Sequence, residues 1–461
     1  MSQFTLNGLR DSSLIHFIGI GGISMSGLAE IMKSRGYRVS GSDWHKSHIT
    51  DRLETLGITV FESQSAGNVQ NADVVVYTAA VKADNPELTA ARENGAVTVS
   101  RAEFLGALMH EFSEAVGIAG THGKTTTTSM LTHAMLKAGT DATVSIGGEL
   151  DLIGGNVRTG HSKYFVTEAC EYTNSFLSFY PKIAVITNIE EDHLDFFSGI
   201  DEIIDSFRRF AMLTKDSGYV VGCGDDENVV KALDNSGLKI VYYGMSDKYD
   251  YYPGNIKYAA GYPEFDVYKK GVSLAHLNMC VPGEHNIQNA LASIAVCDLL
   301  CLDIDKCAEG ICEFSGTKRR FEKKGELNGA VIFDDYAHHP TEIKATLNAA
   351  SKLEHNKLWC VFQPHTYSRT RTLWQDFVSS FDLADEVIIT HIYAAREVYD
   401  GVTNPDELAA DIAKRGINVR YIEEFCDIEK ILKNELQAGD IIFTMGAGNV
   451  VDIADDLCKR G

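Results

Sequence analysis

The residues best suited to bind a phosphate lie at positions 120–127, which read Gly-Thr-His-Gly-Lys-Thr-Thr-Thr. They follow an apolar run at 115–119 that predicts a short strand. A strand that turns through glycines into a helix presents backbone N–H groups and the positive end of the helix dipole to an anion. Lys124 would place a charge on the β- and γ-phosphates, and the Thr125 hydroxyl would hold Mg²⁺. The pattern predicts a protein that uses a nucleoside triphosphate.

This loop is shorter than the general phosphate-binding pattern, because Ile118 stands where that pattern has its first glycine. The alternative is a structural turn before a Thr-rich helix, but Gly-Lys-Thr directly after a strand is a specific combination. We therefore expect the triphosphate to lie against the following residues: Gly120, Thr121, His122, Gly123, Lys124, Thr125 and Thr126.

A second glycine-rich turn, at residues 19–27, follows the strand predicted at 14–18. It is similar to the dinucleotide-binding fingerprint, although Ser24 occupies the position of the third glycine. Asp43 follows at about the distance expected for an acid that binds a ribose hydroxyl. The turn predicts a diphosphate-bearing nucleotide at a helix N-terminus. A structural turn and a nicotinamide-dependent enzyme are the alternatives that this segment alone leaves open.

Acidic residues and a histidine follow two further predicted strands, at 163–166 and 183–187. Carboxylates and imidazoles at the carboxyl ends of parallel strands suit Mg²⁺ and the groups around it. We expect Glu171 and His193 to be the ligands. The other acids of the second segment are expected to form a solvated turn; they are Glu190, Glu191 and Asp192.

Two segments near the predicted boundary of the last domain could contact the nucleotide. Residues 284–289 open a predicted helix with side chains that include an imidazole and two asparagine amides, which could bind a nucleobase or cap the helix. The basic run 318–320 lies at a domain junction, from which an arginine could reach the triphosphate.

Histidines and an arginine also follow two strands of the last segment. For His338 and His339 we expect ligand binding or the start of a helix rather than a metal site, because no Cys or His partner spacing completes one. His365 and Arg369 follow the next strand, where an imidazole and a guanidinium are fit to grip a carboxylate.

The composition is that of an ordinary globular protein, with 44% hydrophobic residues among 461. A formal net charge of −22 argues against nucleic acid as a partner, since general nucleic-acid binding needs a basic surface. No apolar run reaches the roughly 18–20 residues that span a bilayer, so no membrane insertion is expected, and no signal peptide is found. The ten cysteines lack C-x-x-C spacing, which favours free thiols in a reducing cytoplasm. Three of them are expected to be buried in a helical stretch: Cys297, Cys301 and Cys307.

Strands alternate with helical stretches along most of the chain, which predicts an α/β fold with mostly parallel sheets. The length suggests about three domains, which we place at 1–108, 109–320 and 321–461. Residues 245–282, rich in Tyr and Gly, look instead like antiparallel strands, and a helix is predicted at 286–300. The predicted strands are 14–18, 74–77, 97–99, 115–119, 163–166, 183–187, 330–333, 358–362, 386–390 and 440–444.

Seven strings, in their order along the chain, resemble the Mur ligases of peptidoglycan synthesis, and the similarity covers essentially the whole chain. They lie at 17–22, 40–43, 119–127, 187–195, 334–342, 362–365 and 446–450. The resemblance implies a Rossmann-like N-terminal domain, a central P-loop ATPase-like domain with a parallel sheet and helices, and a Rossmann-like C-terminal domain. It also implies ATP-dependent joining of L-alanine to the carboxylate of UDP-N-acetylmuramate through an acyl phosphate, with Mg²⁺, or Mn²⁺ in its place.

The resemblance further implies a role for each matching residue. UDP-sugar binding would fall to Gly19, Gly21, Gly22, Ser24 and Asp43. Besides the phosphate-binding loop, ATP would contact His285, Asn286, Asn289, Arg320 and Asp335. The metal would be held by Thr125, Glu171 and His193, and the amino acid would lie near His338, His365 and Arg369. The catalytic set would be Lys124, Glu171, His193 and His338.

The chain departs from the family pattern at two places. In relatives, acidic residues are common around Glu171, where this chain has Cys170, Tyr172 and Thr173. An arginine also commonly follows the histidine of the Gln-Pro-His string in relatives, whereas Thr366 follows it here.

The nearest alternative function is a recycling ligase that joins a ready-made peptide to the same UDP-sugar. Alternatives of other classes are a nicotinamide-dependent oxidoreductase, which leaves the loop at 120–127 without a role, and a nucleotide-sensing module, which leaves the C-terminal His and Arg cluster without one.

Overall fold

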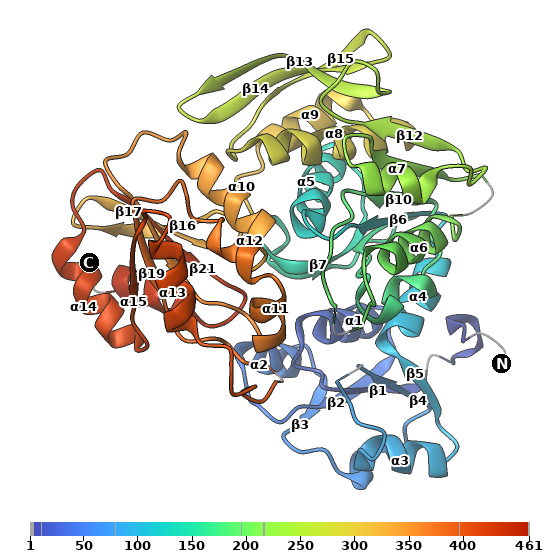
Figure 1. Ribbon diagram of the computed structural model, residues 1–461. Helices are drawn as coiled ribbons and strands as arrows, with labels where there is room; N and C mark the ends of the chain where they lie inside the picture. Colours follow the sequence, from blue (N-terminus) through green and yellow to red (C-terminus); the bar gives the residue numbers. More distant parts are fainter. Residues whose placement is uncertain are drawn as a thin grey trace.

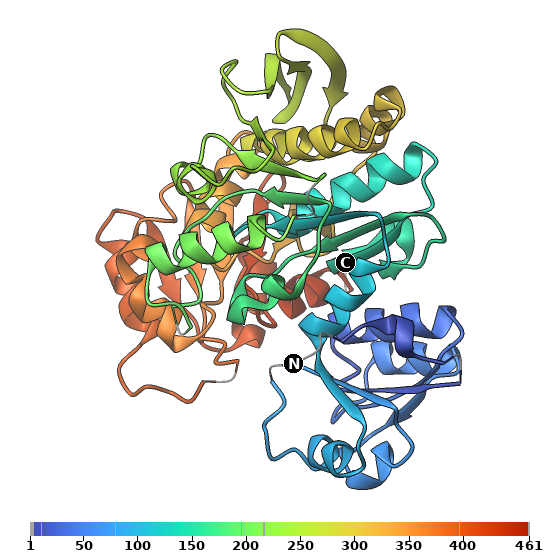
Figure 2. The same cartoon turned by 90° about the vertical axis from the view of Figure 1, so that its right-hand side faces the viewer.

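The computed structural model describes residues 4–10, 12–78, 80–194, 196–214, 217–395 and 397–459. Asp195, the last residue of the string at 187–195, lies outside them. The described residues form three β-sheets, each in a body of its own, and the three bodies follow one another along the chain (Figure 1). The C-terminal body lies beside the central one and the N-terminal body lies beneath it, as the rotated view in Figure 2 also shows.

The N-terminal sheet is parallel throughout, with the strand order β3-β2-β1-β4-β5. Strands β1 and β4 are almost fully buried, because hydrophobic clusters cover both faces. The predicted strands β1, β4 and β5 are confirmed. Two strands were not predicted: β2, whose residues are mostly small or polar, and β3, which has only three residues. The strands are β1 (Leu14–Ile18), β2 (Arg38–Ser42), β3 (Thr59–Phe61), β4 (Val74–Tyr77) and β5 (Val97–Ser100). The helices are α1 (Ile23–Ser34), α2 (His48–Thr55), α3 (Pro86–Glu93) and α4 (Arg101–His110), with 3-10 turns η1 (Leu6–Gly8) and η2 (Ala66–Val69).

The central sheet has the order β15-β14-β13-β12-β11-β10-β6-β9-β7-β8 and is mixed rather than parallel throughout. Its middle strands are parallel, while β8 and the β13–β15 meander pair in antiparallel fashion, the meander as predicted. The meander extends away from the rest of the body (Figures 1 and 2). The strands are β6 (Glu114–Ala119), β7 (Thr143–Leu150), β8 (Gly155–Arg158), β9 (Tyr164–Glu168), β10 (Ile183–Ile186), β11 (Tyr219–Cys223), β12 (Ile240–Tyr243), β13 (Tyr251–Ala259), β14 (Tyr262–Lys269) and β15 (Val272–Asn278).

The helices of the central body include α5, which follows the phosphate-binding loop and packs against α8 and α9. The predicted helix at 286–300 is confirmed as α8. The elements are α5 (Lys124–Lys137), α6 (Ile200–Ala211), α7 (Glu227–Leu233), α8 (Glu284–Leu299) and α9 (Ile304–Cys312), with 3-10 segments η3 (Asp151–Ile153) and η4 (Tyr172–Ser178).

The C-terminal sheet has the order β16-β17-β21-β18-β19-β20, and all its neighbours are parallel except β16 and β17. The polar hairpin strand β16 was not predicted, because it carries little of the apolar pattern on which strand prediction depends. The strands are β16 (Glu322–Leu327), β17 (Ala330–Asp335), β18 (Leu358–Phe362), β19 (Glu386–Ile389), β20 (Asn418–Tyr421) and β21 (Ile441–Met445). The helices are α10 (Pro340–Ala350), α11 (Tyr367–Thr372), α12 (Trp374–Val378), α13 (Pro405–Ala413), α14 (Phe425–Glu435) and α15 (Val451–Cys458).

Helix α1 joins the N-terminal body to the central one. A Cβ atom on Gly27 would lie 2.3 Å from Val157 Cγ2, so only glycine allows α1 to approach β8 this closely. Asn156 Nδ2 donates to the carbonyl of Ile23 over 2.7 Å, and Arg52 Nη1 donates to the carbonyl of Gly154 over 2.8 Å. The glycine-rich turn before α1 is thereby held close to the central body.

Two predictions about composition are answered by the fold. Within the described residues, no helix combines the length and apolar character that crossing a membrane would require. All ten cysteines are described and carry free thiols. Cys297 and Cys307 are buried in helices as expected, but Cys301 is exposed, because it follows α8 with a φ of 56° and faces outward from the turn.

Candidate active site

The phosphate-binding loop connects β6 to α5, as predicted. Gly120 and Gly123 have φ values of 145° and 81°, which favour glycine. A Cβ atom on Gly120 would lie 1.9 Å from Thr187 Oγ1, so the loop needs this glycine to approach the end of β10. The His122 N–H donates to Asn188 Oδ1 over 2.8 Å. These contacts fix the loop on the neighbouring strand end before any ligand binds.

Three residues predicted to act together do lie together beside this loop. Lys124 Nζ is 3.0 Å from Glu171 Oε2 and donates to the Thr121 carbonyl over 3.1 Å. Burial alone would lower the pKa of Lys124, but the Glu171 carboxylate raises it, so the ammonium stays charged. His193 Nε2 lies 3.9 Å from Glu171 Oε1, and burial lowers the pKa of this imidazole. The Lys124 ammonium and the neutral His193 imidazole therefore both lie next to the Glu171 carboxylate.

Glu168 belongs to the same site, although the sequence prediction selected only Glu171 from this strand end. It accepts a hydrogen bond from the Gly147 N–H over 2.6 Å. Burial raises the pKa of Glu168, while Gly147, Lys124 and Thr125 act in the opposite direction. Its position at the end of β9, beside the first turn of α5, is the signal that could have identified it.

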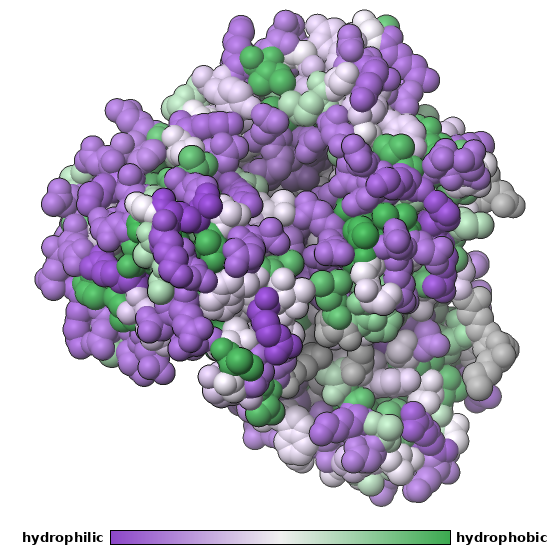
Figure 3. Space-filling view, viewed as in Figure 1, coloured by the Kyte–Doolittle hydropathy of each residue, from purple (hydrophilic) through white to green (hydrophobic). Residues whose placement is uncertain are grey.

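A cavity of about 340 Å³ opens next to the loop, between the central and C-terminal bodies. Figure 3 shows a recess among mostly hydrophilic side chains on this side of the molecule. Eight of the residues predicted to bind ATP line the cavity: His122, Gly123, Thr126, His285, Asn286, Asn289, Arg320 and Asp335. The lining also includes residues that were not predicted, among them Asn188, Asp225, Tyr243, Gln288, Phe314 and Glu342.

The polar groups of the cavity are held in place by the fold. Asn289 Nδ2 donates to Asn286 Oδ1 over 3.0 Å, and Asn289 Oδ1 accepts from the Thr127 hydroxyl over 3.1 Å. Asp335 accepts from two backbone N–H groups, and its burial raises its pKa to about 6. Burial lowers the pKa of His285 to about 4, so this ring is neutral near pH 7. Asp225 is the second residue after β11, a strand that was not predicted from the sequence.

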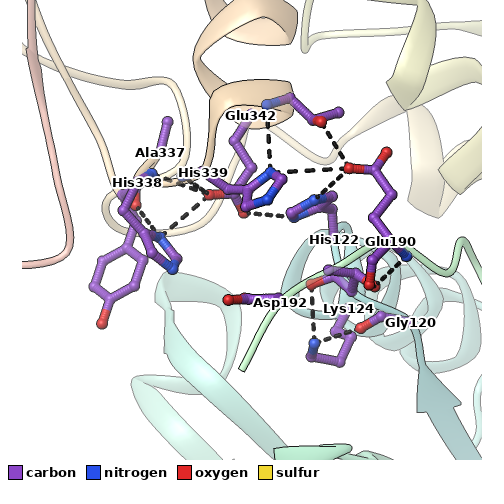
Figure 4. Close-up of polar contacts among 12 residues, drawn as sticks. Gly120, His122, Lys124, Glu190, Asp192, Ala337, His338, His339 and Glu342 are labelled. Carbon is purple, nitrogen blue, oxygen red and sulfur yellow. Dashed lines mark hydrogen bonds and ion pairs between the residues drawn. The ribbon is translucent and has the colours of Figure 1, made fainter. Parts of the chain in front are cut away.

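His122 connects the phosphate-binding loop to the C-terminal body (Figure 4). Its Nε2 lies 3.3 Å from Glu190 Oε2 and its Nδ1 lies 3.2 Å from Glu342 Oε1. Burial opposes protonation, but the two carboxylates outweigh it and raise the pKa of His122 to about 9. The expectation of a solvated Glu190 is wrong, because this carboxylate is held between His122 and the Thr341 hydroxyl, 2.6 Å away. Only Glu191 of that turn is exposed.

The predicted amino-acid-binding residues lie together across the same junction. Arg369 Nη1 is 3.0 Å from His365 Nδ1, and the rings of His365 and His338 have centroids 5.7 Å apart. Arg369 Nη2 also donates to Asp192 Oδ1 over 2.7 Å. The expectation of a solvated Asp192 is therefore wrong. Although burial would raise the pKa of Asp192, the guanidinium of Arg369 holds it well below its ordinary value.

His338 and His339 fulfil different structural functions. His339 is the N-cap residue of α10, which confirms the expected start of a helix. His338 Nδ1 lies 3.2 Å from Glu342 Oε2. The neighbouring imidazole of His365 is buried, and this burial lowers its pKa to about 3. Glu342 is thus shared between His338, four residues before it, and His122, and its pairing with His122 was not predicted because His122 belongs to another domain.

The turn predicted to bind the UDP moiety lies at the carboxyl end of β1, where the strand order reverses. Gly19 and Ile20 donate their N–H groups to the Ser42 carbonyl over 2.8 and 3.0 Å. The Gly21 N–H donates to Asp43 Oδ2 over 2.9 Å, so the predicted acid is held against the turn. Gly22 is the N-cap of α1.

Arg101 was not predicted at this site. Its Nη1 donates to Ser24 Oγ over 2.9 Å, which places a cation at the first turn of α1. The signal that could have identified it is its place at the start of α4, directly after β5. The N-terminal turn and the loop before α5 are therefore two separate glycine-rich turns at helix N-termini, on two different bodies.

Two nucleotide-type sites and a polar junction between three α/β bodies define a multidomain nucleotide-dependent enzyme. The chain belongs to the Mur ligase family. Three models of this family match it in order: "Mur ligase family, catalytic domain" at residues 14–113, "Mur ligase middle domain" at 118–297 and "Mur ligase, glutamate ligase domain" at 319–448.

The similar proteins extend over nearly the whole chain. A UDP-N-acetylmuramate–L-alanine ligase of Caldanaerobacter subterraneus is 50% identical over 97% of both chains, and that of Clostridium beijerinckii is 47% identical over 99% of this chain and all of its own. A UDP-N-acetylmuramate–alanine ligase structure from Thermotoga maritima has a TM-score of 0.81 at 30% identity, over 97% of this chain and 98% of that one. A murein peptide ligase structure from Psychrobacter arcticus, with the same coverage, has a TM-score of 0.72 at 26% identity.

Proposed function

We propose that this protein is the ligase that joins L-alanine to the carboxylate of UDP-N-acetylmuramate with consumption of ATP, in peptidoglycan precursor synthesis. The observation that carries the proposal is the convergence of Lys124, Glu171 and His193 with His338, His365 and Arg369 at one junction. Relatives 47–50% identical over almost the full length have this activity in their names. A ligase of this kind needs one site for a UDP-sugar and one for ATP, which matches the two anion-binding turns.

The first step transfers the γ-phosphoryl group. An oxygen of the muramate carboxylate attacks the γ-phosphorus of ATP, the bond to the β–γ bridging oxygen breaks, and ADP leaves. Attack of one anion on another requires neutralisation of charge, which fixed cations in a closed site supply without reorganisation. Lys124 is one such cation and needs only to exchange its contact with Glu171 for one with the phosphates. Arg320, which lines the nucleotide cavity, is the other.

The residues present also fit a divalent cation. Glu171 is a buried carboxylate, His193 faces it, and Thr125, in the first turn of α5, has its side chain hydrogen-bonded to Glu168. Hydroxyl and carboxylate oxygens are the ligands that Mg²⁺ prefers, and the imidazole is a ligand that Mn²⁺ also accepts. When bound, such an ion would supply positive charge next to the phosphates.

The second step forms the amide bond. The amine nitrogen of L-alanine attacks the acyl carbon, the bond from carbon to the phosphate oxygen breaks, and inorganic phosphate leaves with the proton that the amine nitrogen gives up. Arg369 would hold the alanine carboxylate, since an arginine binds this group through two parallel hydrogen bonds. His365, with a pKa of about 3, is too weak a base to take the proton and serves to orient Arg369.

The experiment that tests the function is phosphate release by the purified protein with each substrate omitted in turn. We expect release only when ATP, UDP-N-acetylmuramate and L-alanine are all present with Mg²⁺. Efficient ligation of a tripeptide without a response to L-alanine would instead assign the recycling reaction of murein peptide ligases. Reduction of NAD or NADP with a hydroxy-acid substrate would favour the oxidoreductase hypothesis, and ATP binding without any ligation would favour a nucleotide sensor.

A further inference from the structure

A second group of metal-ligating side chains lies outside the Lys124–Glu171–His193 site. His122 from the phosphate-binding loop, Glu190 after β10 and His339 at the start of α10 each place one ligand atom within 4.8 Å of the others. Figure 4 shows the two rings next to each other, both facing the Glu190 carboxylate from the same side. Across the described ranges of the chain, this is the one group of three His, Cys, Asp or Glu residues with such spacing.

Both imidazoles are held through the nitrogen that does not face Glu190. His122 has Nδ1 on Glu342 Oε1 at 3.2 Å and Nε2 on Glu190 Oε2 at 3.3 Å. His339 has Nε2 on the Glu191 carbonyl at 3.2 Å, which fixes the proton on that nitrogen and leaves Nδ1 unprotonated, 3.8 Å from Glu190 Oε2. Metal-ligating histidines are oriented in this way, by a carboxylate or a backbone carbonyl on the second ring nitrogen.

The Thr341 N–H approaches His339 Nδ1 at 3.4 Å, which marks the same nitrogen as the acceptor. The hydroxyl of Thr341 lies 2.6 Å from Glu190 Oε2 and would move aside or become a further oxygen neighbour of an ion. A second carboxylate, Glu342, lies behind His122, and it is also paired with His338 at 3.2 Å and with Arg320 at 3.7 Å.

The donor set selects the class of ion. Two imidazoles and one carboxylate form a three-residue Zn²⁺ site with an open fourth position. A tetrahedral ion with bonds of roughly 2.0–2.1 Å would hold its ligand atoms about 3.3 Å apart, which is close to two of the spacings observed here. Mg²⁺ prefers oxygen ligands and keeps several bound water molecules, so it competes poorly with Zn²⁺ for a site that has two nitrogen ligands.

The ion would have a route to this position. Glu190 and Thr341 line the nucleotide cavity, and together with His339 and Lys344 they also line an open hollow of about 380 Å³ on the other side. The three ligands therefore stand between two solvent-accessible spaces. Two of them belong to the central body and one to the C-terminal body.

We propose that His122, Glu190 and His339 bind one transition-metal dication of the Zn²⁺ class, which displaces the Nε2 proton of His122 to solvent, and that the ion ties the C-terminal domain to the phosphate-binding loop. The site shares no ligand with the one described for Mg²⁺, and the proposal does not depend on the function proposed above. Because two ligands lie on the central side of the domain junction and one lies on the C-terminal side, the ion would bind to this arrangement of the two domains and oppose their separation.

The test is Zn²⁺ binding by the full-length protein without nucleotide, measured by competition with a chromophoric chelator under excess Mg²⁺. His339→Asn removes one ligand while a side-chain oxygen can still cap α10. We expect one Zn²⁺ per wild-type chain and an affinity at least about a hundredfold weaker in H339N, since even a partner outside the ligand set contributes 10–100-fold. With Co²⁺, wild-type protein should show the visible absorption bands of a tetrahedral site and H339N should not.

His276→Asn is the matched control, because His276 lies on the surface with its Nδ1 2.8 Å from Asp266 Oδ1 and could hold an adventitious ion. H276N should bind Zn²⁺ as wild type does. Should H339N fail to fold, Glu190→Gln replaces it with the same expected loss. In hydrogen exchange, Zn²⁺ should protect both the 120–123 loop and the start of α10 in wild type alone. Equal Zn²⁺ binding by wild type and H339N, absence of binding by wild type, or protection of only one segment would overturn the proposal.

Discussion

Arg369 and Asp192 form an ion pair that joins the C-terminal domain to the central domain. Arg369 Nη2 and Nε lie 2.7 and 3.2 Å from the same oxygen, Asp192 Oδ1, and both side chains are about nine-tenths buried. Arg369 follows β18 and Asp192 follows β10, so the pair connects the carboxyl ends of two sheets. Asp192 also directly precedes His193 in the chain, which places Arg369 close to a residue of the proposed catalytic set.

We predict that Arg369→Ala raises the apparent KM for L-alanine by roughly ten- to a hundredfold. An arginine–carboxylate pair in a closed site contributes on the order of 1.5–3 kcal/mol, and 1.4 kcal/mol corresponds to a factor of ten. The KM values for ATP and the UDP-sugar should change far less. Steady-state kinetics with each substrate varied in turn measure the three values.

Two further variants distinguish substrate binding from a purely structural connection. Arg371→Ala is the matched control, because Arg371 is exposed and pairs with Asp400 within its own domain. Asp192→Asn removes the partner of Arg369 without removing the guanidinium. If R369A and D192N raise all three KM values alike, Arg369 holds the domains together and does not bind alanine.

The turn before α1 gives a prediction about UDP-sugar binding. A Cβ atom on Gly21 would lie 2.8 Å from Asp43 Oδ2, so Gly21→Ala should push the carboxylate away from the ribose position. Loss of a charged hydrogen bond contributes about 1.5–3 kcal/mol, which corresponds to roughly ten- to a hundredfold in Kd for UDP-N-acetylmuramate. Isothermal titration calorimetry would measure this Kd.

Gly67→Ala is the control for that variant, since the nearest atom to its Cβ would be a serine hydroxyl 3.9 Å away. ATP affinity should be the same in both variants and in wild type. UDP-sugar binding by G21A at wild-type strength would remove Asp43 from the proposed site.

The strands and turns that follow local patterns could be predicted from the sequence. Apolar runs such as 14–18 and 358–362 became β1 and β18, and glycine-rich turns after β1 and β6 lie where their spacing required. Strands with polar or small residues, such as β2 and β16, could not be recognised, because their burial depends on partners elsewhere in the chain.

The contacts between domains could not be predicted for the same reason. The sequence around Glu190 and Asp192 predicts a solvated acidic turn, because it contains no lysine or arginine that would pair with them. Their partners, Thr341 and Arg369, are about 150 and 177 positions away and meet them only when the C-terminal domain packs against the central one. Glu342, which pairs with His122, was missed in the same way.

Lys124→Ala should lower turnover by at least about a hundredfold, the scale observed when one main electrostatic group at a developing charge is lost. The affinity for the UDP-sugar should remain nearly unchanged, because Asp43 and Gly21 lie in the N-terminal domain. Single-turnover phosphate release and calorimetry would report the two quantities separately.

The Lys124 prediction has a structural control. Lys137 lies at the far end of the same helix and pairs with Glu313 at the surface, so Lys137→Ala should leave turnover unchanged. Loss of UDP-sugar binding in K124A would contradict the division of the two nucleotides between two domains.

The last prediction concerns the pH dependence of the contact between His122 and its two carboxylates. The pKa of His122 is raised from 6.5 to about 9 in the folded protein, so its protonated form stabilises the folded state. That contribution is present in full below pH 6.5 and is lost as the pH rises through about 9, with an upper bound on the order of 3 kcal/mol. Glu342 and Glu190 have lowered pKa values and stay ionised over this range, so His122 is the group of the three that titrates.

We therefore expect the Tm advantage of wild type over His122→Gln to be largest near pH 6 and to disappear above about pH 9.5. The measurement is thermal unfolding of both proteins from pH 6 to 10, with a chelator present so that no metal ion replaces the proton. At each pH, the Tm of the variant is subtracted from that of wild type, which removes the contribution of every group that titrates in the same way in both proteins. A difference that is constant with pH, or that grows as the pH rises, would mean that His122 is neutral in the folded protein and that its two carboxylates do not hold an imidazolium between them.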